Sequence, residues 1–82
     1  MIFLSKDLPI SAFQSGAHIE LNSNREAVIE GIKGIIEYSD LYIKLSLPKG
    51  TLELFGSDLE IVTLSAGGVI IGGLIYKLEF DI

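Results

Sequence analysis

The sequence predicts an all-β domain, a small antiparallel β-sandwich or rolled barrel of roughly seven to eight strands. Apolar and polar residues alternate with a period of two through most of the chain, and turn-forming residues separate the alternating runs. No segment of useful length carries apolar residues at the period of a helix. Glycines recur inside the runs at places where a strand would bend.

The alternating runs define the expected strands. In residues 41–47, leucine and isoleucine alternate with tyrosine, lysine and serine, which is typical of a strand that is buried on one face. The same alternation recurs in residues 19–21, 51–55, 59–62 and 76–81. Between these runs lie segments rich in Asn, Ser, Asp, Pro and Gly, namely 22–24, 39–40, 48–50, 57–58 and 65–68. Such short turns favour antiparallel pairing of successive strands.

Three structural glycines are expected to bend strands over the core. Gly31, Gly56 and Gly73 each follow two apolar residues spaced by two, and apolar alternation resumes after each of them. Glycine inside a strand pattern indicates a bulge or a sharp bend, because it adopts positive φ without strain. Three ordinary hairpin corners would predict nearly the same contacts, so both interpretations stay open.

Residues 1–16 differ from the rest of the chain. They lack clean alternation, and Pro9 removes a backbone donor that a central strand would need. We expect an N-terminal arm or edge segment here, and a single all-β domain over residues 17–82.

Composition excludes several classes of site. The chain has no cysteine and one histidine, His18, so disulfides, thiolate ligands and multi-histidine metal sites are excluded, and no cofactor is expected. Eleven acidic residues against six basic ones give a net charge of −5, which disfavours nucleic acid and anionic membrane surfaces. The longest uncharged stretch, 62–76, is too short to span a bilayer. We therefore expect a cytoplasmic protein without direct membrane insertion.

No pattern predicts catalysis. His18 has no Ser, Asp or Glu at a spacing known from catalytic arrangements. Gly67-Gly68 and Gly72-Gly73 precede strands, whereas a phosphate loop precedes a helix. The glutamates fall on alternating strand positions typical of a solvated face, although two of them opposed across strands would form an acid–base pair or a cation site. We expect a protein that is not an enzyme.

A protein-binding surface is the better prediction. The apolar fraction is 49% and the mean hydropathy is +0.52, more than so small a body readily buries. Phe55, Val62, Leu64 and Ile70 lie out of step with the expected core positions, so they form the candidate interface. Unpaired edge strands would offer a second route to a partner.

Residues 19–80 resemble the YabP/YqfC family of small proteins from spore-forming bacteria. The segments that carry the resemblance are 29–38 (IEGIKGIIEY), 43–45 (IKL), 50–61 (GTLELFGSDLEI) and 70–80 (IIGGLIYKLEF), together with Asp7-Leu8-Pro9. The resemblance implies a sporulation protein of the mother cell without enzymatic activity. It also implies recruitment to the forespore envelope through a membrane-anchored protein partner, and it brings no catalytic motif.

Two functions from different classes follow as expectations. The first is a protein–protein interaction or assembly module in sporulation, which docks on a membrane-anchored partner or forms a homo-oligomer. The second is a small-ligand or carbohydrate-binding β-domain at the spore envelope.

Overall fold

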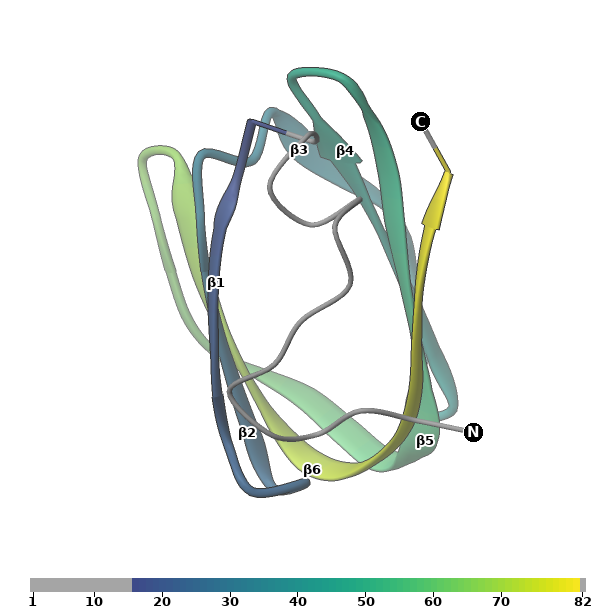
Figure 1. Ribbon diagram of the computed structural model, residues 1–82. Helices are drawn as coiled ribbons and strands as arrows, with labels where there is room; N and C mark the ends of the chain where they lie inside the picture. Colours follow the sequence, from purple (N-terminus) through teal and green to yellow (C-terminus); the bar gives the residue numbers. More distant parts are fainter. Residues whose placement is uncertain (1–15, 82) are drawn as a thin grey trace.

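The computed structural model describes residues 16–81, which form six β-strands and no helix (Figure 1). The strands are β1 (His18–Asn22), β2 (Glu26–Glu30), β3 (Gly34–Tyr38), β4 (Tyr42–Leu47), β5 (Gly50–Ser65) and β6 (Gly68–Asp81). Every hydrogen-bonded pair of strands is antiparallel, and the order across the sheet is β1-β2-β6-β5-β4-β3. The predicted all-β antiparallel class is confirmed.

The two longest strands, β5 and β6, run through both halves of the sheet. Residues 51–57 of β5 pair with 74–81 of β6, and β4 and β3 follow on the other side of β5. Residues 60–65 of β5 pair with 68–72 of β6, and β2 and β1 follow on the other side of β6. We call these the β4 half and the β2 half. Figure 1 shows β5 and β6 curving sharply between them, so the sheet folds over on itself.

Gly56 and Gly73 lie at this bend. A Cβ on Gly56 would collide with the backbone carbonyl oxygen of Leu74, so only glycine permits this approach of β5 to β6. Gly73 has a φ of +124°, and a Cβ there would collide with the carbonyl oxygen of Asp58. Gly31, with a φ of +89°, lies between β2 and β3, where it separates two strands.

The number of strands is six in the described residues, whereas seven to eight were expected. The difference arises because β5 and β6 stay hydrogen-bonded through the bend, so each counts as one strand. For the same reason the strands form one open sheet, with β1 and β3 at its ends, in place of two separate sheets or a closed barrel.

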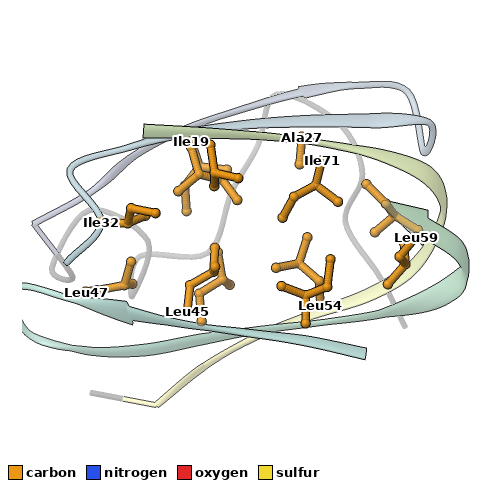
Figure 2. Packing of buried hydrophobic residues seen from close by; sticks show 13 residues of the cluster. Ile19, Ala27, Ile32, Leu45, Leu47, Leu54, Leu59 and Ile71 are labelled. Carbon is orange, nitrogen blue, oxygen red and sulfur yellow. The ribbon is translucent and has the colours of Figure 1, made fainter. Parts of the chain in front are cut away.

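The core lies between the two halves (Figure 2). Ile19, Ala27 and Ile71 project from the β2 half, and Leu45 and Leu54 face them from the β4 half. The buried apolar residues are Ile19, Ala27, Ile29, Ile32, Ile43, Leu45, Leu47, Leu52, Leu54, Leu59, Val69, Ile71 and Ile75. They come from all strands except β3, whose Ile35 packs against this cluster while partly exposed.

The predicted N-terminal arm, 1–16, lies outside the described residues except for Gly16.

Candidate interaction surface

Large apolar side chains are exposed mainly along one side of the folded sheet. Four of the six with the greatest exposure lie on β3 and on the part of β5 in the β2 half. They are Ile36 (50% exposed), Tyr38 (53%), Val62 (56%) and Leu64 (59%). We call these four residues the edge patch. Leu41, in the turn before β4, and Tyr76, on β6, are the other two.

The edge patch joins strands from the two halves of the sheet. The Tyr38 hydroxyl accepts a hydrogen bond from the Ile61 amide at 3.4 Å, which ties β3 to β5 at one end. At the other end, the carbonyl oxygen of Gly67 accepts hydrogen bonds from the amides of Gly31 (2.7 Å) and Ile32 (3.1 Å). The two edge strands therefore run side by side in opposite directions, although no backbone ladder joins them.

A groove of about 360 Å³ opens between these edges at the end where Leu64 lies. Its lining is Ile32, Lys33, Gly34, Ile35, Leu64, Ser65 and Gly67. Ile32 is buried and Ile35 is half-buried, so the groove reaches the margin of the core. Lys33 is exposed at its rim and makes no ion pair with any described residue.

A bulge in β5 decides where Val62 and Leu64 lie. Ile61 pairs with Ile71 and Thr63 pairs with Ile70, so Val62 is the extra residue between them. After the bulge, Leu64 lies opposite the buried Val69. Since directly opposed residues share a face, Leu64 belongs to the face that carries the core, and it is exposed because it lies at the edge.

A second bulge shapes β3. Ile35 pairs with Leu45 and Glu37 pairs with Lys44, so Ile36 is the extra residue. In a regular strand, every second residue faces the core. The bulge interrupts this alternation, which leaves Ile36 half-exposed on an edge strand. Sequence alternation did not identify Ile36 or Tyr38 as surface candidates, because a bulge leaves no pattern in a single sequence.

The four residues of the predicted interface divide into two groups. Val62 and Leu64 both lie in the exposed edge part of β5, with Leu64 on the core face and the Val62 side chain over Gly72 on the outer face. Ile70 is half-buried on the outer face of the β2 half, between Val28 of β2 and Thr63 of β5. The structure thus brings Val62 and Leu64 to one edge and leaves Ile70 on the adjoining outer face.

Phe55 lies apart from the other three, on the outer face of the β4 half. It is flanked across the strands by Tyr42 and Lys77. The rings of Phe55 and Tyr42 are 5.0 Å apart between centroids, and the Lys77 Nζ lies 5.2 Å from the Phe55 centroid. Phe55 is consequently half-buried beneath two neighbours.

The outer face of the β4 half also carries a row of charges. Glu37, Lys44, Glu53 and Glu79 lie side by side across β3, β4, β5 and β6. Desolvation, the hydrogen bond to Glu53 and the negative charges of Glu53, Glu37 and Glu79 raise the pKa of Tyr42 to about 12. Tyr42 therefore stays protonated at neutral pH and acts as a hydrogen-bond donor.

Residues 16–81 show neither a cluster of three or more His, Asp or Glu side chains able to hold a metal nor a helix long and apolar enough to cross a membrane. His18, the single histidine, lies 3.1 Å from the Glu20 carboxylate on exposed β1, with both side chains more than 60% exposed. Neither residue of this pair lines the groove beside Leu64.

Comparison with known proteins assigns the chain. Residues 14–81, which include all six strands, match the model of the YabP family. Neither a curated protein nor a solved structure matches the chain. The family match covers most of the sequence. It agrees with the resemblance that the sequence shows over residues 19–80. The chain belongs to the YabP family.

Proposed function

We propose that this protein is a non-enzymatic interaction or assembly module in sporulation, and that the edge patch is its binding surface. Membership of the YabP family suggests the sporulation-related role. The observation that carries the proposal is the concentration of four exposed apolar side chains on two neighbouring sheet edges. Small soluble domains rarely leave such a group facing solvent unless a partner covers it.

The backbone along the edge patch supports the same function. Beyond Ile61, the free side of β5 pairs with no strand among residues 16–81, and β3 is the last strand at its end of the sheet. Unpaired amides and carbonyls on an edge accept an added strand from another chain. Natural edges are often protected by lysine or proline, whereas Val62–Ser65 has neither.

The setting that we propose is the mother cell, at the forespore envelope, with a membrane-anchored protein as one partner. The resemblance to YabP/YqfC proteins supports this setting. The acidic chain, with its net charge of −5, would reach the envelope through that partner, because anionic lipid repels it.

The groove beside Leu64 favours a second candidate function, the binding of a small ligand. Its volume of about 360 Å³ falls in the range of small-molecule pockets. Lys33 is the single charged side chain in its lining, and such sites ordinarily place several converging polar groups around an apolar body. The groove fits an apolar side chain of a protein partner better.

Capture of partners from sporulating cells tests the proposal. Tagged protein is compared with Leu64→Asp and with the matched control Leu41→Asp, since both leucines are 59% exposed and Leu41 lies outside the edge patch. Leu64→Asp should lose the captured partner and Leu41→Asp should retain it. Equal capture by both variants, with β-type circular dichroism preserved, would remove the edge patch from the proposal.

A further inference from the structure

We infer that the edge patch joins two copies of this chain, related by a two-fold axis that runs from one half of the folded sheet to the other. The inference deepens the proposed function and rests on it, because it names a second copy as the occupant of the same surface. In this dimer, β5 pairs antiparallel with the partner's β5, and β3 with the partner's β3.

The two edges suit symmetric pairing because each carries apolar residues near its middle. Ile36 is the central residue of β3, and Val62 and Leu64 flank Thr63 in the exposed part of β5. An antiparallel two-fold pairing brings the middle of a strand against the middle of its copy. It would place Ile36 beside Ile36 of the partner subunit, and the segment Val62–Leu64 beside the same segment of the partner subunit.

Charge selects this axis over the alternative. The edge patch has Lys33 at one end, and Asp40, Asp58 and Glu60 at the other, all exposed. A two-fold axis that runs from the β2 half to the β4 half crosses the edge strands, so each strand lies antiparallel to its copy. The Lys33 end of each copy then meets the acidic end of its partner. An axis parallel to the strands would instead set Lys33 against the partner's Lys33, and acid against acid, which is unfavourable.

The positions of Lys33 and Glu60 agree with this register. Lys33 lines the groove together with Ser65 and Gly67. In an antiparallel pairing of β5 with its copy, centred on Thr63 or Leu64, Glu60 lies opposite residues 66–68 of the other chain. Glu60 therefore comes next to Lys33 of the partner subunit. Lys33 has no ion-pair partner among residues 16–81, and the dimer supplies one to Lys33 in each of the two copies.

Sedimentation velocity on the full chain, over a wide range of concentration, tests the dimer. Wild type should show a concentration-dependent dimer, and Leu64→Asp should weaken it by at least about 100-fold, because a carboxylate would be buried without a partner. The control Tyr76→Asp, at an exposed position of β6 outside the edge patch, should leave it unchanged. A wild type that stays monomeric at millimolar concentration would overturn the inference.

Charge exchange tests the axis. Lys33→Glu should weaken the dimer about tenfold at low salt, and less at high salt, because two attractive pairs become repulsive. Lys49→Glu, in the turn between β4 and β5, changes the net charge equally and should have no effect. Lys33→Glu mixed with the double variant Asp40→Lys/Glu60→Lys should form heterodimers, although neither self-associates well. An unchanged dimer in Lys33→Glu would overturn the inference.

A single introduced cysteine gives a direct readout, because the chain has none of its own. Ile36→Cys lies on the two-fold axis and should form an intersubunit disulfide under mild oxidation. Tyr76→Cys, at a position 49% exposed against 50% for Ile36, should remain reduced at the same protein concentration. Crosslinking of Tyr76→Cys but not of Ile36→Cys would overturn the inference.

The outcomes separate the inference from the proposed function. A strictly monomeric wild type, together with loss of a captured protein in Leu64→Asp, would overturn the dimer and leave the edge patch as a surface for another protein. A dimer that Leu64→Asp does not weaken would overturn the inference alone, and equal capture by Leu64→Asp and wild type would in addition overturn the proposed function of the edge patch.

Discussion

The hydroxyl of Tyr42 on β4 donates a hydrogen bond of 2.8 Å to the Oε2 atom of Glu53 on β5. The two residues come from adjacent strands of the β4 half and are offset by two positions in register, since Glu53 pairs with Lys44. The bond links the aromatic pair of Tyr42 and Phe55 to the row of acidic side chains beside it. The hydrogen bond that connects the two groups therefore requires a protonated Tyr42.

Tyr42 should make stability fall at alkaline pH. Its pKa is raised from 10.0 to about 12 in the folded chain, so between these values the unfolded chain has lost the proton that the folded chain keeps. Fewer protons are bound in the unfolded state, and the free energy of unfolding therefore decreases as pH rises from about 10 to about 12. Chemical denaturation at pH 9, 10 and 11 measures the decrease.

Tyr42→Phe is the control for this pH dependence. It keeps the ring against Phe55 and removes the titrating hydroxyl, so the fall in stability should become shallower over the same pH window. The difference between the alkaline ultraviolet titrations of wild type and Tyr42→Phe should show a midpoint near 12. A midpoint near 10 in that difference would contradict the assignment.

Gly56→Ala should destabilise the fold strongly. The added Cβ would strike the Leu74 carbonyl oxygen at the bend, and neither backbone can move without breaking the pairing of β5 with β6. We expect a loss of about 3 kcal/mol or failure to fold, since overpacking against backbone is among the costliest single changes. Gly34→Ala is the matched control, because a Cβ there meets nothing within 4 Å. Thermal unfolding of the two variants decides the point, and equal melting temperatures would contradict it.

The alternating pattern was sufficient to predict most of the core, because burial with period two holds wherever the strands are regular. Leu45, Leu47, Leu52 and Leu54 are all buried as their alternation requires, and Leu59 resumes the pattern after the bend. The pattern fails at Val62 and at Ile36. There an extra residue shifts the alternation, and nothing in the residue type distinguishes a bulged position from a paired one.

Cross-strand register explains the rest of what the sequence could not provide. Phe55 does lie on the outer face, as its alternation with Leu54 predicts, but Tyr42 and Lys77 cover it. Which residues stand opposite Phe55 depends on how β4 and β6 pair with β5, and a single sequence does not encode that register visibly. The edge patch also depends on the folding-over of the sheet, which brings β3 beside the far part of β5.

Core and edge leucines should respond differently to truncation. Leu54 is fully buried and Leu64 is 59% exposed, although both lie on the face of β5 that carries the core. Leu54→Ala should cost about 2 to 5 kcal/mol through lost burial and a residual cavity. Leu64→Ala should change stability by less than about 0.5 kcal/mol in the monomer. Urea denaturation, at a protein concentration too low for the dimer to form, measures both changes. A large loss of stability for Leu64→Ala would place that side chain in the core.

Phe55 and Lys77 should be energetically coupled. The Lys77 Nζ lies 5.2 Å from the ring centroid and also 3.1 Å from the Glu79 Oε1 atom, so the ammonium is held over the ring by a neighbour on its own strand. Phe55→Leu keeps an apolar side chain but removes the ring face that attracts the cation, and Lys77→Met keeps the aliphatic stem but removes the charge. A double-mutant cycle in urea should give a coupling free energy of about 0.5 to 1 kcal/mol, the range for an exposed cation–π contact.

The control cycle uses Lys44→Met in place of Lys77→Met, because Lys44 faces Glu37 and Glu53 across the strands. The effects of Lys44→Met and Phe55→Leu on stability should be additive. Additivity in both cycles would show that Phe55 is held by packing against Tyr42 alone.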